Sequence, residues 1–221
     1  MRIILKPAGT LVVVIAFGTL IGLLALRDHR SGTGASTELL PAANASQAKT
    51  DTVSENLLQN AGFEGNFRPL TPSTDKAVLN GTTAMPWNDD SAWAHVNATY
   101  SPDHHTFHSG TCSQKIEVLS VKHSDSALDT VQFVQRLVLT RGTHYSAGIW
   151  VRADRQTTIY FMLRQAGPPF TTYGTQEVAV GTKWQQIKLD AEVTQEGDSF
   201  LMLNAGTPAT LWVDDANLSR D

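Results

Sequence analysis

The chain has a single cysteine, Cys112, among its 221 residues, so no disulfide can form within it. A domain without disulfides has to be stabilised by its hydrophobic core or by a bound metal. Positive charge is also scarce, because 17 Lys and Arg residues stand against 21 Asp and Glu and the formal net charge is −4. A chain without a basic surface is a poor partner for a polyanion, which argues against nucleic acid as the partner.

The sequence also lacks the common catalytic motifs. It has no Gly-x-Ser-x-Gly elbow, no glycine-rich phosphate loop and no His-Glu-x-x-His zinc motif. The adjacent carboxylates Asp89 and Asp90 do not have the arrangement of an acid–base pair flanking a glycosidic bond. The His-rich stretch 103–108 matches no metal-ligand spacing. These absences predict a protein that is not an enzyme.

One long hydrophobic run is present near the N-terminus. Residues 8–26 contain no charge, and a run of this length can cross a bilayer as a helix. It ends in bulky residues, whereas a cleaved signal peptide ends in small ones. Residues 1–30 are therefore predicted to be an uncleaved signal anchor; a cleaved signal peptide and a buried core helix are the alternatives. Residues 31–54 are rich in Ser, Thr, Ala, Gly and Asn and predict a flexible tether.

This organisation predicts a single-pass membrane protein. Lys and Arg flank both sides of the apolar run, so their distribution does not decide its orientation. The short N-terminal tail and the long C-terminal domain favour translocation of that domain. Together with the lone cysteine, this plan predicts a bacterial inner-membrane protein whose domain lies on the periplasmic side.

Residues 55–221 carry the pattern of an all-β domain. Gly, Pro, Asn and Asp interrupt the chain at short intervals, and β-branched and aromatic runs lie between them without a helical period. Strands are expected at 112–120, 130–140, 144–153, 157–165, 176–180, 185–191, 199–204 and 211–218. Eight or more short strands predict a two-sheet β-sandwich of jelly-roll type.

Four segments resemble, in order, parts of the CenC-like carbohydrate-binding modules. Residues 56–65 resemble the opening motif of that family and residues 211–218 its closing motif. Between them, 133–153 resembles its paired central strands and 181–187 a later turn followed by a Trp. The resemblance covers residues 55–218. It implies a galactose-binding-like sandwich that binds a polysaccharide or oligosaccharide without catalysis.

The resemblance also implies a structural calcium site that joins the two ends of the domain. The opening Glu of the family corresponds to Glu64 and its closing Asp to Asp214, with Asp215 as the alternative. Calcium accepts both carboxylate and carbonyl oxygens, and the carbonyl ligands are expected from the turn at 110–113. In the alternative interpretation, Glu64 caps a turn and Asp215 faces solvent.

A sugar site needs an aromatic face for the pyranose ring and planar polar groups for its hydroxyls. Alternation places Trp150 and Arg152 on the outward side of one strand, and Tyr160 and Arg164 on the outward side of the next. A single sheet face carrying these four side chains is predicted to bind the sugar.

Two further residues are assigned to this site. Gln135 is preferred over Gln132 as a polar contact from the neighbouring strand, because it matches the Gln-bearing strand of the family. Trp87 stands where the family carries a Trp that can line the cleft. For each Trp, burial in the core is the alternative.

A second hypothesis comes from a different class of protein. CenC-like modules usually accompany glycoside hydrolases, and no hydrolase segment is recognisable here. The chain would then be a membrane-anchored adaptor that keeps the sandwich and binds another envelope protein through a sheet edge or an exposed patch. Exposed aromatics in a concave groove would favour sugar, and a flat apolar patch would favour the adaptor.

Overall fold

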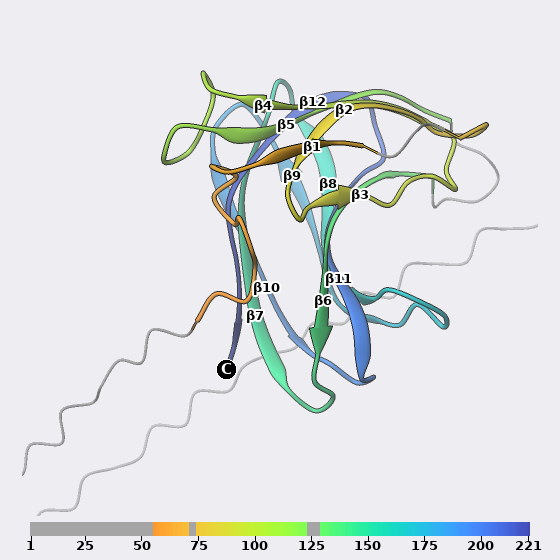
Figure 1. Cartoon of the computed structure of the whole chain (residues 1–221), viewed down its shortest axis with the longest axis vertical. Helices are drawn as coiled ribbons and strands as arrows, with labels where there is room; N and C mark the ends of the chain where they lie inside the picture. Colours follow the sequence, from red (N-terminus) through yellow and green to blue (C-terminus); the bar gives the residue numbers. More distant parts are fainter. Residues whose placement is uncertain (1–54, 71–73, 123–128) are drawn as a thin grey trace, which may run out of the picture. The chain divides into compact units, whose positions relative to one another are not determined.

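The computed structural model describes residues 55–70, 74–122 and 129–221. The predicted anchor and tether, residues 1–54, lie outside them. The described residues form strands and turns without a helix (Figure 1). In this part of the chain there is accordingly no helix with the length and apolarity needed to span a membrane. The prediction of an all-β domain is confirmed.

The larger sheet has seven strands, in the order β1-β2-β4-β5-β12-β7-β10. β2 and β4 run parallel, and the other neighbours are antiparallel. The strands are β1 (Phe67–Pro69), β2 (Val78–Ala84), β4 (Val96–Asp103), β5 (Ser113–Val121), β12 (Ala209–Arg220), β7 (His144–Ala153) and β10 (Gln185–Glu192).

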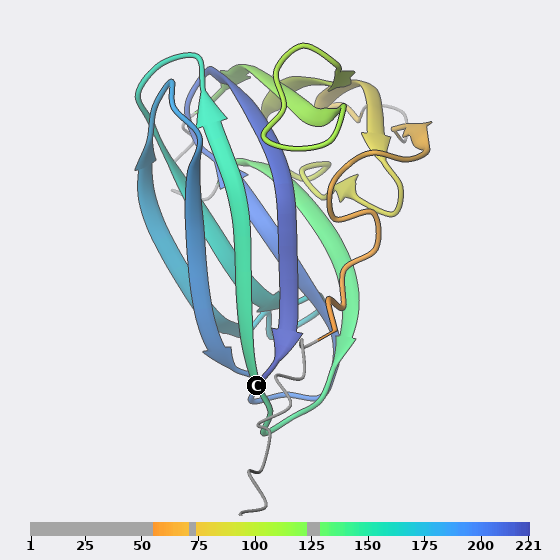
Figure 2. The same ribbon diagram turned by 90° about the vertical axis from the view of Figure 1, so that its left-hand side faces the viewer.

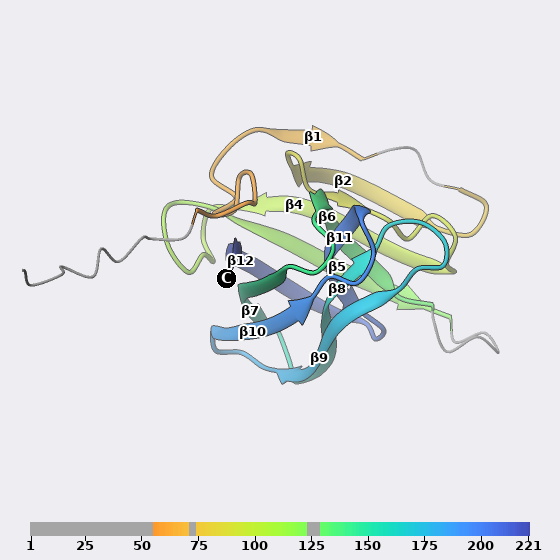
Figure 3. The same cartoon turned by 90° about the horizontal axis from the view of Figure 1, so that it is seen from below.

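The smaller sheet has five antiparallel strands, in the order β3-β6-β11-β8-β9. They are β3 (Asn88–Asp89), β6 (Val131–Leu139), β11 (Gly197–Ala205), β8 (Thr157–Gln165) and β9 (Thr172–Val180). Figures 2 and 3 show the long strands of the two sheets as two layers. The predicted two-sheet sandwich is therefore what the chain forms.

Side-chain alternation explains most of these strands. In β10, for example, Ile187, Leu189 and Ala191 are buried, and the residues between them are exposed. Such a strand can pack one face on a core and leave the other in water. All eight expected strands are present, with boundaries that differ by a few residues.

The four strands between residues 67 and 103 were not expected. They are short or interrupted by turn-forming residues, such as Gly81 in β2. Gly81 has a φ of +93°, and a Cβ there would lie 1.9 Å from the carbonyl oxygen of Tyr100 in β4. Only glycine permits this close parallel pairing, so the residue that looks like a strand breaker is what allows the strand.

The core lies between the sheets and is rich in aromatic rings. Trp87 is fully buried and stacks on Phe133, with ring centroids 5.0 Å apart and planes 11° apart. Phe63 packs against the same indole at 5.2 Å. Buried aromatic side chains of this size contribute several kcal/mol each to the stability of a domain, of the order of 3–5 kcal/mol on truncation.

The segments that open and close the domain lie side by side. The Leu57 N–H donates to the Leu218 carbonyl at 2.7 Å, and the Ala216 N–H donates to the Ala61 carbonyl at 2.9 Å. The Asn56 side chain accepts from the Leu218 N–H at 3.0 Å and donates to the Ala216 carbonyl at 3.0 Å. Backbone and side-chain hydrogen bonds therefore join the two ends of the domain.

Candidate functional site

The outer face of the smaller sheet, here called the five-stranded face, is built in rows across neighbouring strands. The register places Gln132, Asn204 and Tyr160 side by side in one row. The next row along the strands is Val134, Met202 and Met162, and the third is Arg136, Phe200 and Arg164. An apolar row thus runs between two rows that carry polar groups.

This face is hollowed. One cavity of about 520 Å³ lies over β6, β11, β8 and β9. A neighbouring hollow of about 370 Å³ shares Arg164 and Phe170 with it and reaches Asp90 and Trp93. The lining of the larger cavity comprises Thr130, Gln132, Tyr160, Met162, Arg164, Phe170, Thr172, Thr175 and Asn204.

The floor is apolar and the edge is aromatic. Met162 lines the larger cavity as its floor and packs on Val134, Phe200 and Met202, a small buried cluster on this outer side of the sheet that is separate from the main core. Phe170 is 49% exposed and Trp93 is 42% exposed, both beside the smaller hollow. An exposed ring next to a hollow offers a surface on which the apolar side of a ligand can pack.

Three buried polar atoms on this face have no hydrogen-bond partner among the described residues. They are Oε1 of Gln132, Oδ1 of Asn204 and Nε of Arg164, and all three residues line the larger cavity. A buried polar atom is normally paired, because an unpaired one costs about 1–3 kcal/mol. Unpaired donors and acceptors around one cavity mark the place where ligand hydroxyls would complete the hydrogen bonding.

Arg164 is held in place by two neighbours. Its Nη2 lies 3.8 Å from Oδ2 of Asp90, and its guanidinium carbon lies 5.3 Å from the centroid of the Phe170 ring. Burial raises the pKa of Asp90, and the positive charge of Arg164 partly offsets this effect. The arginine therefore presents its donors to the cavity from a fixed position.

The prediction that Trp150, Arg152, Tyr160 and Arg164 share one face is wrong. β7 pairs with β12 and β10 in the larger sheet, whereas β8 pairs with β11 and β9 in the smaller one. Outward side chains of the two strands therefore lie on opposite sides of the sandwich. Only Tyr160 and Arg164 belong to the hollowed face.

The aromatic rings on the outer side of the larger sheet are engaged within the chain. The imidazole of His108 stacks on Trp150, with centroids 3.8 Å apart, and meets the edge of Trp184 at 5.7 Å. The Arg152 guanidinium lies 5.1 Å from the Trp212 ring. These contacts fasten the segment before β5 onto the sheet and leave less of each ring for a ligand.

Two other predicted contacts are turned away from the cavity. Trp87 is 0% exposed, so its indole has no surface to offer a sugar. Gln135 is 2% exposed, and both ends of its amide are bonded to the backbone of Gln59, each at 2.9 Å. Gln135 therefore docks the N-terminal segment, and the alternative glutamine, Gln132, is the one that reaches the cavity.

The sequence analysis does not identify Asn204 and Thr175 as cavity residues. The pattern does contain a signal for Asn204, because it alternates with core residues on the outward side of β11. Thr175 lies in the first half of β9, which the sequence does not predict to be a strand.

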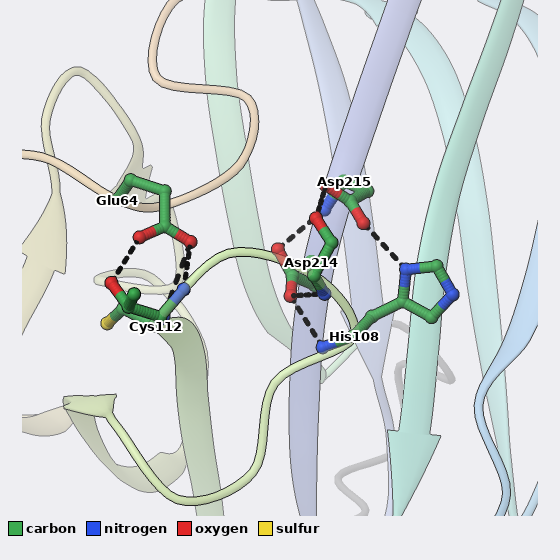
Figure 4. A network of polar contacts seen from close by, with 7 residues as sticks. Glu64, His108, Cys112, Asp214 and Asp215 are labelled. Carbon is green, nitrogen blue, oxygen red and sulfur yellow. Dashed lines mark hydrogen bonds and ion pairs between the residues drawn. The ribbon is translucent and has the colours of Figure 1, made fainter.

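The carboxylates assigned to calcium lie at a different place, around residues 108–112 (Figure 4). Glu64 accepts the Thr111 N–H at 2.8 Å, the Thr111 hydroxyl at 2.7 Å and the Cys112 N–H at 3.3 Å. The Thr111 hydroxyl makes the largest contribution to lowering the pKa of Glu64. A Cβ on Gly110 would lie 1.8 Å from Oε1 of Glu64, so glycine is required at that turn.

Asp214 and Asp215 hold the same segment from β12. Asp214 is 0% exposed and accepts the N–H groups of His108 at 2.7 Å and Ser109 at 3.2 Å. Burial raises the pKa of Asp214 from 3.8 to about 6, although these N–H groups act in the opposite direction. Asp215 lies 2.6 Å from Nδ1 of His108 and accepts the Ser109 hydroxyl at 2.8 Å.

Glu64, Asp214 and Asp215 therefore meet around one loop. Within the described ranges, no group of three or more His, Cys, Asp and Glu side chains is arranged to hold a metal ion. The carboxylate oxygens suit a hard cation, and a metal site here would need backbone oxygens as its remaining ligands. One carbonyl of the turn at 110–113, that of Thr111, lies 3.1 Å from Nδ1 of His104.

Two packed sheets, with a hollow edged by aromatic rings on the outer face of the smaller sheet, are the architecture of a β-sandwich ligand-binding module. Residues 55–205 match the family model CBM_4_9, described as "Carbohydrate binding domain". The match covers more than half of the chain, and the chain belongs to this family of carbohydrate binding domains.

Solved structures of carbohydrate-binding proteins have the same fold. A structure described as "CBM4 structure and function" is 17% identical, covers 74% of this chain and 99% of its own, and has a TM-score of 0.54. A "putative sugar binding protein from Bacteroides thetaiotaomicron VPI-5482" is 10% identical, with coverages of 76% and 100% and a TM-score of 0.54. No curated protein sequence matches the chain significantly.

Proposed function

We propose that the chain binds a polysaccharide or oligosaccharide, without catalysis, through the five-stranded face. The observation that carries this proposal is the set of unpaired polar atoms of Gln132, Asn204 and Arg164 around an apolar floor. Sugar hydroxyls would pair with these atoms, and the apolar side of the pyranose ring would pack on the floor. The resemblance to CenC-like modules supports the same function.

Each side chain has a distinct role in this proposal. Tyr160 stands next to Asn204 in the register and provides an aromatic wall at one end of the larger cavity. Trp93 and Phe170 provide exposed rings at the other hollow. Arg164 lies between the two hollows and would bond the hydroxyls of adjoining sugar units. Two connected hollows favour a chain of several units over a single monosaccharide.

A glycan array with the full-length chain, prepared without sugar-headgroup detergents, tests this function. We expect binding to a defined glycan and a loss of about tenfold or more in affinity for Tyr160→Ala, because a contact at the centre of a site typically contributes more than about 1 kcal/mol. Leu119→Ala is the control, since Leu119 is exposed on β5 of the other sheet. Absence of binding by a folded chain would reject the proposal in favour of a protein adaptor.

We also propose that Glu64 and Asp214 bind a structural calcium ion, with Asp215 as the alternative ligand. Asp214 is fully buried, and within the described residues it forms no salt bridge with Lys or Arg. A bound calcium ion would supply the missing positive charge. Glu64 lies in the opening segment, residues 56–65, and Asp214 in the closing one, residues 211–218, so the ion would strengthen their junction.

A membrane anchor at residues 1–30 and a tether at 31–54 complete the proposal. The support is the uncharged apolar run at 8–26. Anchoring would place several copies of the domain on the periplasmic side of a bacterial inner membrane, where multivalency raises the avidity for a polysaccharide. Resistance of the full chain to alkaline carbonate extraction, with the domain protected from protease in intact cells, is the expected result. Release into the soluble fraction would contradict it.

A further inference from the structure

The opposite side of the sandwich carries a second hollow. It has a volume of about 320 Å³ and lies over β7, β10 and β12 of the larger sheet. None of its lining residues belongs to the five-stranded face. Its polar lining and its floor are contributed by Ser146, Gly148, Gln186, Lys188, Asp190 and Asn217.

Gly148 forms the floor of this hollow. The register places it between Lys188 on β10 and Asn217 on β12, next to the bulge between Asp214 and Asn217. A Cβ at this position would lie 2.4 Å from Oδ1 of Asn217 and 3.6 Å from Nε2 of Gln186. The Asn217 amide therefore lies over the buried Gly148 backbone, in space that a side chain on Gly148 would take, and forms the floor together with it.

The polar side chains around the floor are not used within the domain. Among the described residues, no hydrogen bond or salt bridge is formed by the side chains of Gln186, Lys188, Asp190 or Asn217. Only the Ser146 hydroxyl is engaged, as a donor to Asp221 at 2.7 Å. Four polar side chains without a partner among the described residues thus line one hollow, and the three on β10 are exposed.

The chemistry of the hollow selects for a neutral ligand with many hydroxyls. Lys188 and the two amides provide donors, and Asp190 and the amide oxygens provide acceptors. Lys188 disfavours a cation, whereas Asp190 and the nearby Asp221 disfavour an anion.

We propose that this hollow, here called the Gly148 pocket, is a second binding site that takes one neutral sugar unit, either a monosaccharide or the end of an oligosaccharide. It is independent of the five-stranded face, which would bind several units of a chain. A module with sites on opposite sides could link two glycan chains, or two parts of one chain.

The test is an NMR titration of the full-length chain with glucose, galactose, mannose and xylose in turn. The amide of Gly148 is the main probe, with those of Lys188 and Asn217. At least one sugar should shift these signals in a saturable way, and the shifts should persist in Tyr160→Ala, whose change lies on the other face. Lys188→Ala should weaken the interaction about tenfold, corresponding to about 1.4 kcal/mol.

Gly148→Ala should abolish these shifts because its Cβ would displace the Asn217 amide from the floor. If Gly148→Ala does not fold, Lys188→Ala becomes the variant that tests the pocket. Lys188 is exposed on the edge strand β10, so its replacement should not affect folding. Leu119→Ala is the control and should leave the titration unchanged. Signals that move with none of the four sugars, or that move equally in Lys188→Ala, would overturn the second site. Failure of the five-stranded face would be seen separately, as unshifted Tyr160 and Arg164 amides with a polysaccharide.

Discussion

The two outer faces of the sandwich carry similar residues and use them differently. On the larger sheet, Trp150 is covered by His108, and Trp212 lies against Arg152. On the five-stranded face, polar atoms of Asn204 and Arg164 remain unpaired around a cavity. The presence of aromatic and cationic residues therefore does not identify a binding face. The difference lies in the rings, which are covered on the larger sheet, because Nε of Arg152 there is unpaired just as Nε of Arg164 is on the five-stranded face.

The difference has a structural cause. The loop before β5 crosses the outer side of the larger sheet because Glu64 and Asp214 bind its backbone N–H groups. This places His108 on Trp150. The five-stranded face is bordered instead by the loop that carries Phe170, which lines the hollow and leaves it open. Glu64 and Asp214 thus hold the loop that covers one face of the domain.

The largest expected effect is on stability, and it tests whether Trp87 is part of the core between the two sheets. Trp87→Ala should reduce the free energy of unfolding by about 3–5 kcal/mol, because it removes a fully buried indole that stacks on Phe133. The measurement is urea unfolding. Trp93→Ala is the matched control and should change stability much less, by about 1 kcal/mol or less, since Trp93 is 42% exposed and lies outside the core. Equal losses in the two variants would contradict this assignment.

The next effect concerns calcium and the loop that covers the larger sheet. Calcium should raise the melting temperature of the full chain, and a chelator should reverse the change. At a calcium concentration of about 100 times Kd, the stabilisation is about 2.7 kcal/mol. Asp214→Asn should abolish the response because it removes a proposed ligand. Asp190→Asn, an exposed carboxylate on β10, is the control. Identical melting of the wild-type chain with and without calcium would reject the site.

The pH dependence of the calcium-free chain should separate buried from exposed carboxylates. Burial raises the pKa of both Asp89 and Asp214 from 3.8 to about 6. A raised pKa in the folded state means that folding favours protonation, so the stability contribution is complete below about pH 4 and is lost as the pH rises through about 6. In chelator, the chain should therefore become more stable from pH 7 to pH 5.

Urea unfolding at these two pH values provides the measurement. Asp214→Asn should show a smaller gain on acidification, because one of the buried carboxyls with a raised pKa is then absent, whereas those of Asp89 and Asp90 remain. The groups with lowered pKa values, among them Glu64, lose their contribution only below their ordinary values and act outside this window. A loss of stability between pH 7 and pH 5 would contradict the assigned directions.

The smallest expected effect is at the rim of the five-stranded face. Trp93→Ala should weaken polysaccharide binding about threefold, because its exposed ring borders only the smaller hollow. Trp184→Ala on the other side should leave that affinity unchanged. Affinity electrophoresis in the preferred polysaccharide compares the two. An equal loss in both would remove the distinction between the faces.

Much of the fold could be predicted from the sequence, since alternation of buried and exposed side chains defines strands such as β7, β8 and β10. Alternation gives the side of a strand on which a residue lies, but not the sheet to which that strand belongs. Trp150 and Tyr160 were placed together because their strands are consecutive, and the crossing from one sheet to the other depends on pairing with β12 and β11, distant in sequence.

The two glutamines of β6, Gln132 and Gln135, show a second limit of predicting site residues from the sequence. Gln135 has the same parity as Phe133, a core residue, so alternation alone would have turned it inward and placed Gln132 on the outer face. The resemblance to a family motif points to Gln135, whereas side-chain alternation points to Gln132. The role of Gln135, which binds the backbone of Gln59, requires the N-terminal segment to be in place and has no signal in the strand itself.

The most direct test of the central claim is a calorimetric titration that compares Arg164→Ala with Arg152→Ala. Both arginines are partly buried next to an aromatic ring, but they lie on opposite faces. With the oligosaccharide selected from the array, Arg164→Ala should bind about tenfold more weakly or not at all, and Arg152→Ala should bind as the wild-type chain does. Loss of binding in Arg152→Ala with full binding in Arg164→Ala would move the glycan site to the larger sheet and contradict the account.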